Sequence, residues 1–155
     1  MLLDLLLYTT VMVVVVGSVI ILKGSSVLFV QETKESAKNK FGLPGGKLED
    51  GETTEECAIR ECKEETGYDI NITDLIALTQ KPSTHEGNNV VRFIYTATIS
   101  QAPRSNHEMQ TIWFTAEQIR RLSINGQIRG KDVTELTIKL LEGNLSSIPM
   151  HHIFY

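Results

Sequence analysis

Three glutamates crowd one side of a segment whose pattern predicts a helix. Glu61 stands three residues before Glu64 and four before Glu65, within Arg60–Gly67. At these spacings, helical side chains lie one above another on a single face. Like charges in this arrangement destabilise a helix, and crowded carboxylates are costly to ionise together. We therefore expect hard divalent cations to neutralise them, and Mg²⁺ is the usual choice where phosphates are bound.

The two ends of this helix are marked in the sequence. Thr53 and Glu56 stand at the positions of a capping box, in which each side chain bonds the backbone N–H of the other residue. Gly67 stands where a left-handed residue often ends a helix. We infer a helix held between two packed layers, with its acidic C-terminal half facing a cleft.

The spacing of residues around this helix resembles the Nudix box, the signature of the Nudix hydrolases. The matching positions are Gly46, five residues, Glu52, seven residues, Arg60-Glu61, two residues, and Glu64-Glu65-Thr66-Gly67. Every charged and glycine position of the signature is present between Gly46 and Tyr68. Two positions that are usually bulky aliphatic hold Cys62 and Tyr68. We expect this departure to affect packing and not ligand chemistry.

The resemblance implies an α/β protein, specifically an α/β/α sandwich around a mixed β-sheet. It also implies hydrolysis of a nucleoside diphosphate linked to another group, with Mg²⁺ as cofactor and Mn²⁺ as an alternative. The implied metal ligands are the carbonyl oxygen of Gly45 and the carboxylates of Glu61, Glu64 and Glu65. Arg60 is expected to orient these carboxylates or screen their repulsion. Glu52 is expected to bind a metal through water or to support its loop.

The identity of the general base is left open by the sequence. Glu108 is the preferred candidate on a distant loop, because it precedes the Trp113 strand as such an acid does in several relatives of the family. A solvated loop acid explains Glu108 equally well. Glu86 is the second loop candidate, and Glu61 is the first choice if the base belongs to the box itself. A carboxylate bound to Mg²⁺ accepts protons poorly, which favours an acid outside the metal site.

Residues outside the box are expected to select the substrate. The candidates are Phe41, Arg92, Gln127 and Arg129. Core packing is the preferred explanation for Phe41, whereas Gln127 and Arg129 stand in a loop bounded by glycines that could reach a phosphate or a base. Nucleotides, thiamine-type pyrophosphates, oxidised-purine triphosphates and ADP-ribose all remain open as substrates.

Length and composition predict a single domain covering residues 1–155. The chain is 41% hydrophobic and 22% charged, which is ordinary for a globular protein with a core. The net charge of −4 argues against general affinity for nucleic-acid polymers. Nine of the nineteen acidic residues fall between Gly46 and Asp69, which suits a metal site. Cys57 and Cys62 point in different directions on the helix, which predicts reduced packing thiols in a cytoplasmic protein.

The first 22 residues hold one charge, Asp4, and are long enough to cross a membrane. No Lys or Arg precedes the apolar run, which argues against a signal peptide. The valines of Val11–Leu22 favour a buried strand, and a second strand is expected at Val27–Val30. We expect Met1–Thr10 to be an apolar flap or interface element, with a membrane or peripheral role as the lesser alternative. A homodimer is compatible with the sequence.

The remaining chain mixes strands and helices without strict alternation, which indicates a mixed sheet between helical layers. Strands are expected at Leu75–Gln80, Val90–Ile99 and Met109–Phe114. Capping-box patterns predict helices from Thr115 to about Leu122 and from Asp132 to near Gly143. Among functions, a pyrophosphohydrolase competes with a nucleotide sensor that binds without hydrolysis, and the complete box favours the enzyme.

Overall fold

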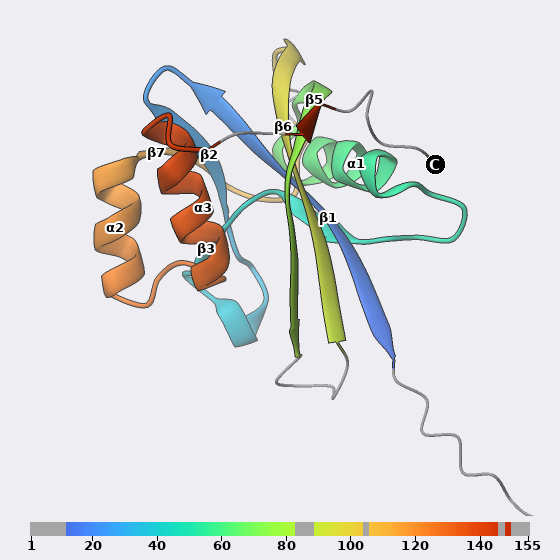
Figure 1. Cartoon of the computed structure of the whole chain (residues 1–155), viewed down its shortest axis with the longest axis horizontal. Helices are drawn as coiled ribbons and strands as arrows, with labels where there is room; N and C mark the ends of the chain where they lie inside the picture. The colour runs from blue at the N-terminus through green and yellow to red at the C-terminus, as the bar shows by residue number, and fades with distance from the viewer. Residues whose placement is uncertain (1–11, 83–88, 104–105, 146–147, 150–155) are drawn as a thin grey trace, which may run out of the picture.

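A mixed β-sheet with helices on both faces is seen in the computed structural model of the chain (Figure 1). The structure describes residues 12–82, 89–103, 106–145 and 148–149. The expected extension Met1–Thr10 and the alternative base Glu86 lie outside these ranges. No helix in the described ranges is both long and apolar enough to cross a membrane.

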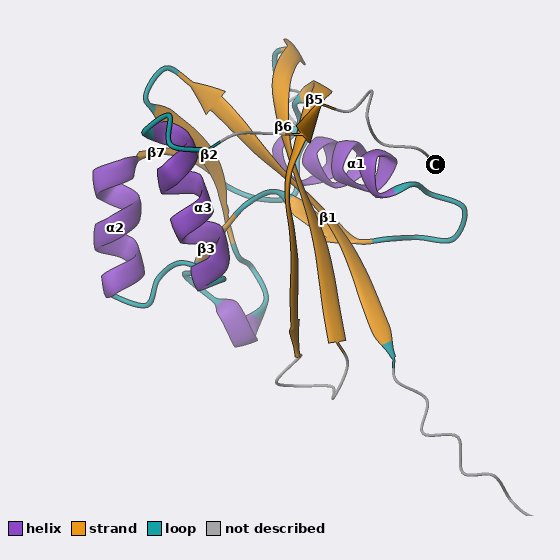
Figure 2. Ribbon diagram, viewed as in Figure 1, coloured by secondary structure: helices purple, strands orange, loops and turns teal. Residues whose placement is uncertain are grey.

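Eight strands of the described residues make up the sheet. They are β1 (Val13–Lys23), β2 (Ser26–Gln31), β3 (Phe41–Gly42), β4 (Gly45–Lys47), β5 (Asp69–Pro82), β6 (Asn89–Gln101), β7 (Thr111–Thr115) and β8 (Ile148–Pro149). The main order is β3-β2-β1-β6-β5-β8, with β4 paired to β1 and β7 paired to β2. β1 and β6 run parallel, whereas the other pairs are antiparallel (Figure 2). This pattern confirms the expected mixed sheet.

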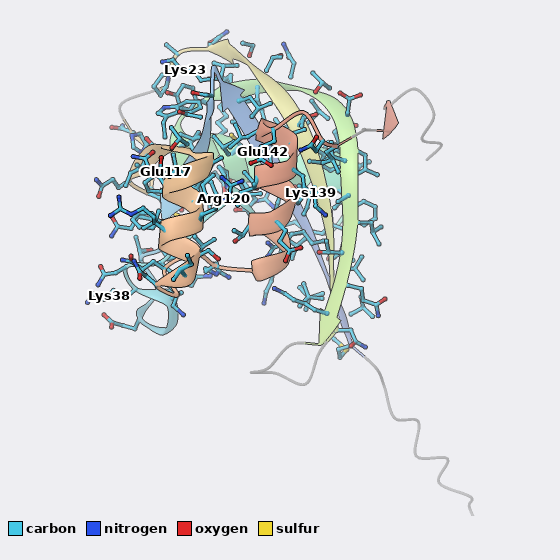
Figure 3. All side chains as sticks on the ribbon, turned by 60° about the vertical axis from the view of Figure 1, so that its left-hand side comes forward. Lys23, Lys38, Glu117, Arg120, Lys139 and Glu142 are labelled. Atoms are coloured by element: carbon cyan, nitrogen blue, oxygen red, sulfur yellow. The ribbon has the colours of Figure 1, made fainter. Side chains whose placement is uncertain are left out.

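The helices lie on opposite faces of this sheet. They are α1 (Thr54–Thr66), α2 (Ala116–Ile124) and α3 (Lys131–Leu141), and a short 3₁₀ turn, η1, covers Glu35–Ala37. In Figure 1, α1 crosses one side of the strands, and α2 and α3 stand together on the other. An ion pair between Arg120 of α2 and Glu142 after α3 joins the last two helices (Figure 3).

The valine-rich run at the start of the described chain forms a strand that is covered on both faces. Along β1, Val19 and Ile21 belong to the core under α1, whereas Ile20 belongs to the core under α2 and α3. All three are fully buried. A strand with two covered faces shows an unbroken apolar run instead of alternation, which explains why this segment also has the composition of a membrane span.

Helix α1 rests directly on β1 at Gly17. A Cβ atom at this glycine would lie 2.5 Å from the carbonyl oxygen of Thr54 and 2.9 Å from the backbone nitrogen of Ala58. The hydroxyls of Thr54 and Tyr95 also form a hydrogen bond of 2.6 Å between the helix and β6. The absence of a side chain at Gly17 therefore lets the helix approach the sheet closely and fixes its height above the strands.

Three features of the downstream chain differ from the sequence predictions. β5 is much longer than Leu75–Gln80, because shifts in its register against β6 interrupt the alternation by which a strand is recognised. β8 lies after the last predicted helix, where the sequence shows no clear pattern and no strand is predicted. Asp132 is not the N-cap of α3, because the helix begins at Lys131 after Gly130, whose carbonyl oxygen already accepts hydrogen bonds from Thr134.

Candidate active site

The termini of α1 fix which of its residues face the neighbouring strands. Thr53 Oγ1 accepts the N–H of Glu56 at 3.2 Å, and Glu56 Oε2 accepts the N–H of Thr53 at 2.9 Å. Gly67 follows the helix with φ of 75° and donates its N–H to the carbonyl of Lys63. Both predicted caps are confirmed. They fix the two ends of the helix, and with them the direction in which its acidic residues point.

A cleft of about 490 Å³ lies where α1 meets the strands. Its lining residues are Val14 and Val16 of β1, Glu32 and Lys34 after β2, Gly45, Gly46 and Lys47 of β4, Glu61 and Glu65 of α1, Lys81 of β5, Val90 and Arg92 of β6, Met109 before β7, and Arg129 before α3. Eight separate segments of the described residues therefore contribute to one hollow, and all of its polar side chains are charged.

Glu65 is the buried acid of this cleft. It is only 7% exposed, and the backbone N–H of Gly45 donates to its Oε2 at 3.0 Å. Burial raises the pKa of Glu65 to about 8, and the charges of Glu61 and Glu32 act in the same direction. The hydrogen bond from Gly45 opposes the rise without cancelling it. A cation at this carboxylate would remove the cost of its negative charge.

Glu61 is pressed against the backbone at Gly46. A Cβ atom at Gly46 would lie 2.1 Å from Oε1 of Glu61, so any other residue there would displace this carboxylate from its present position. Burial raises the pKa of Glu61, while the hydrogen bond and charge of Arg60 lower it and the charges of Glu64 and Glu52 raise it. Two carboxylates with raised pKa values thus share one hollow.

Arg60 ties the loop before α1 to the acidic face of the helix. Its Nε and Nη2 donate to the two carboxylate oxygens of Glu52 at 2.5 and 3.0 Å, and Nη1 donates to Glu61 and Glu64 at 3.0 and 3.3 Å. Nη2 also reaches the carbonyl of Lys47 at 3.1 Å. The Arg60 guanidinium is the main cause of the lowered pKa of Glu52. Arg60 therefore connects Glu52 and Lys47, which precede α1, to Glu61 and Glu64 of the helix.

Glu52 and Glu64 lie beside the cleft instead of lining it. Glu52 accepts from Arg60 and from the backbone N–H of Glu49, which matches the expectation that it supports its loop. The Glu64 side chain is 47% exposed and contacts Arg60. Among the described residues, no group of three or more His, Cys, Asp or Glu is arranged as a metal site. Ligation by Glu64 accordingly stays a prediction.

The donor set of the cleft nevertheless fits a hard divalent cation. Glu61 and Glu65 offer carboxylate oxygens, which Mg²⁺ and Mn²⁺ prefer over nitrogen or sulfur. Burial raises the pKa of both carboxyls, so their charged forms would be favoured by a bound cation. Gly45, the predicted carbonyl ligand, lines the same hollow.

Glu108, the predicted loop base, docks on the end of α1 through its backbone. Its N–H donates to the carbonyl of Glu64 at 3.0 Å, and the N–H of Met109 donates to the carbonyl of Glu65 at 3.1 Å. These bonds satisfy two carbonyls of the last helical turn. The Glu108 side chain is exposed, and Met109, not Glu108, lines the cleft. Its role as base stays a prediction.

Two of the four predicted substrate residues, Arg92 and Arg129, line the cleft. Phe41 instead packs edge-on against Phe114, with ring centroids 5.0 Å apart, as the core-packing explanation requires. Gln127 lines a smaller hollow beside α2, and its carbonyl accepts the N–H of Phe41 at 2.8 Å. The Gln127 loop is therefore fastened to β3 beside the cleft.

Glu32 is a cleft residue that the sequence prediction missed. It is 8% exposed, follows β2, and forms an ion pair with Arg129, which is 97 residues away in the chain. No pattern in the sequence around Glu32 indicates that Arg129 is its partner. The pairing depends on a parallel bridge between Phe41 and Ile128, which brings the segment before α3 next to β3.

Comparison with known proteins identifies the family. A family model described as the NUDIX domain matches residues 12–136, which include the whole cleft. The chain belongs to the Nudix hydrolase family. Among solved structures, a Nudix hydrolase from Nitrosomonas europaea superposes with a TM-score of 0.78 over 94% of this chain and 97% of that one. At 22% identity, this likeness shows that the α/β fold is shared.

Curated Nudix relatives carry different activities in their names. The chain is 30% identical over 133 residues to a Caenorhabditis elegans protein named as a nudix hydrolase, covering 81% of this chain and 34% of that protein. It is 35% identical over 76 residues to the ADP-ribose pyrophosphatase of Methanocaldococcus jannaschii, covering 49% and 45%. It is 28% identical over 128 residues to human 8-oxo-dGDP phosphatase NUDT18, covering 79% and 36%. The chain therefore spans less than half the length of these relatives.

Proposed function

We propose that this Nudix protein hydrolyses a phosphoanhydride bond in a small nucleoside diphosphate, nucleoside triphosphate or related diphosphate, with Mg²⁺ or Mn²⁺ as cofactor. The observation that carries the proposal is that two carboxylates, Glu61 and Glu65, line the same cleft as the backbone of Gly45 and Gly46 and several basic side chains. Such a cleft can hold a cation and a phosphate chain together. The names of the relatives, an ADP-ribose pyrophosphatase and an 8-oxo-dGDP phosphatase, support the same reaction class.

The residues of the cleft divide the work between holding the cofactor and holding the substrate. Glu61, Glu65 and the carbonyl of Gly45 would bind the cation, and Glu64 would join them by leaving Arg60. When bound, a divalent cation polarises a phosphoryl group and lowers the pKa of a coordinated water. Arg92 and Arg129 would bind phosphate oxygens, since guanidinium groups match them in charge and geometry. Glu108 is the proposed acceptor of the water proton.

The state of the cysteines supports a reducing compartment. Cys57 and Cys62 are both buried and free of a disulfide. Burial raises the pKa of Cys62 to about 11, so its thiol stays protonated at neutral pH. We propose a cytoplasmic location, where thiols of this kind remain reduced.

The test is a panel of nucleoside di- and triphosphates, ADP-ribose and thiamine diphosphate, assayed for released phosphate, pyrophosphate or nucleoside monophosphate. Activity should require Mg²⁺ or Mn²⁺ and disappear with a chelator. Glu65→Gln should lower kcat by about 10²-fold or more, as expected for loss of a charge that holds the cofactor.

Glu135→Gln provides the matched control, because Glu135 is an exposed glutamate of α3 outside the cleft. This variant should retain normal turnover. Normal turnover in Glu65→Gln at saturating Mg²⁺ would refute the proposed site. Binding of a nucleotide without any hydrolysis would instead favour a sensor.

A further inference from the structure

The cleft concentrates positive charge in a protein that is acidic overall. Five of its lining side chains are basic, and each comes from a different segment of the chain: Lys34, Lys47, Lys81, Arg92 and Arg129. Three lining side chains are acidic, so the hollow carries two positive charges in excess, whereas the whole chain has a net charge of −4. A concave surface of one sign attracts and concentrates ligands of the opposite sign.

The distribution of charge within the cleft is also uneven. Glu32 forms an ion pair with Arg129. Glu61 forms an ion pair with Arg60, which does not line the cleft. The side chains of Lys34 and Lys47 make no ion pair within the ranges that the structure describes, and both are exposed. These two ammonium groups are therefore available to a ligand in the hollow. A divalent cation at Glu61 and Glu65 would increase the positive charge further.

The described residues of the cleft offer few features with which to distinguish one nucleobase from another. Its other side chains are apolar and aliphatic: Val14, Val16, Val90 and Met109. Within the described ranges, no aromatic, amide or hydroxyl side chain lines it. Proteins that identify a base stack it on aromatic rings and hydrogen-bond its edges. Phe41, which could supply such a contact, packs against the core, and Gln127 lines the smaller hollow.

We propose, building on the proposed function, that this cleft selects its substrate by the negative charge of the phosphate chain and does not identify the base. The preferred class is a compact triphosphate with a free terminal phosphate, whether or not it carries a nucleoside. A diphosphate esterified at both ends, such as ADP-ribose, carries about two negative charges at neutral pH, and a triphosphate monoester carries about four. The lining alone has an excess of two positive charges, and one divalent cation bound at Glu61 and Glu65 would raise the excess to four, which matches the second class.

The reaction on this class is ordinary hydrolysis of the anhydride. Water attacks one phosphorus, the P–O bond to the bridging oxygen breaks, and the bond's electron pair leaves with the departing phosphate. One proton of the water goes to the base and then to solvent. No further reactant is needed. The lysines hold the departing and retained phosphates without taking part in the bond changes.

The test compares kcat/KM for inorganic triphosphate, two nucleoside triphosphates with different bases, and ADP-ribose at the same Mg²⁺ concentration. We expect the two nucleotides to agree within about 5-fold and inorganic triphosphate to fall within about 10-fold of them. ADP-ribose should be poorer by about 10-fold or more, since charge complementarity separates ligands of different charge. A 100-fold preference between the two bases, or a preference for ADP-ribose, would overturn the proposal.

The double variant Lys34→Gln, Lys47→Gln tests the proposed contacts directly. It should lower kcat/KM for the triphosphates by about 10-fold and for ADP-ribose by about 2-fold or less, because only the triphosphates present the additional charge. Lys139→Gln is the matched control, since Lys139 lies on α3 (Figure 3) and outside the cleft. Equal losses for both substrate classes would refute selection by charge.

A binding measurement separates this inference from the proposed function. If no probe is hydrolysed with either metal, the proposed function fails. Calorimetry with inorganic triphosphate and ADP-ribose in Ca²⁺ then decides the inference by itself. Tighter binding of inorganic triphosphate, weakened by the double lysine variant, would uphold selection by charge. Equal or weaker binding of inorganic triphosphate would overturn it.

Discussion

Replacing Glu65 by Gln should stabilise the metal-free protein at alkaline pH. The pKa of Glu65 rises from its ordinary value of 4.5 to about 8 because the carboxyl is buried, with the charges of Glu61 and Glu32 adding to the effect. The folded state therefore holds this proton more tightly than the unfolded state does. Its contribution to stability is complete below about pH 4.5 and is lost as the pH rises through about 8.

The magnitude follows from the difference between the two pKa values. A rise from 4.5 to about 8 corresponds to about 5 kcal/mol lost between acid and alkaline pH, and relaxation around the site would reduce this to about 2–5 kcal/mol. Gln keeps the size of the side chain and cannot ionise. The variant should therefore lack this part of the pH dependence and exceed the wild type in stability at pH 9.

Urea denaturation in the presence of a chelator measures this effect at pH 5, 7 and 9. The difference in unfolding free energy between Glu65→Gln and wild type should grow steadily with pH, while Glu135→Gln should follow the wild type. Added Mg²⁺ should reduce the difference at pH 9, because a cation stabilises only the ionised wild-type site. A constant difference across the three pH values, or a variant that is less stable at pH 9, would refute the reasoning.

Three further predictions concern the surroundings of the same cleft. Gly46→Ala places a methyl group where the Glu61 carboxylate now lies. A metal titration should therefore show Mg²⁺ affinity reduced by about 10-fold or more, and normal affinity would contradict this prediction. Arg60→Lys cannot reproduce the two bonds to Glu52, so thermal and urea unfolding should show lower stability than in the wild type, and unchanged stability would contradict this role of Arg60. Glu108→Gln should lower kcat by about 10²-fold with little change in Mg²⁺ titration, and unchanged turnover would assign the base elsewhere.

The parts of the fold that could be predicted are those encoded by neighbouring residues. The caps of α1 depend on contacts within four residues, and both were predicted correctly at Thr53 and Gly67. The buried β1 strand follows from one unbroken apolar run. The Nudix spacing likewise belongs to a single helix and the loop before it. Local patterns of this kind survive tertiary packing because packing uses the same faces that the patterns define.

The parts that could not be predicted depend on contacts between distant residues. The ion pair of Glu32 with Arg129 requires β3 to lie beside the segment before α3. The sequence of neither segment indicates that the two are in contact. The bulges of β5 hide its length because they move successive side chains off strict alternation. Gly130 is the N-cap of α3 and provides no side-chain hydrogen bond, so the capping pattern at Asp132 predicts the wrong cap residue.

The acidic face of α1 is divided between two kinds of positive partner, the guanidinium of Arg60 and a proton on Glu65. Arg60 neutralises the exposed end of the face through Glu64 and one oxygen of Glu61. No hydrogen bond joins Arg60 to Glu65 among the described residues, and burial raises the pKa of Glu65 to about 8. A divalent cation in the cleft would compete with Arg60 for Glu61 and with a proton for Glu65. Binding of the proposed cofactor should therefore release a proton and become tighter as the pH rises toward 8.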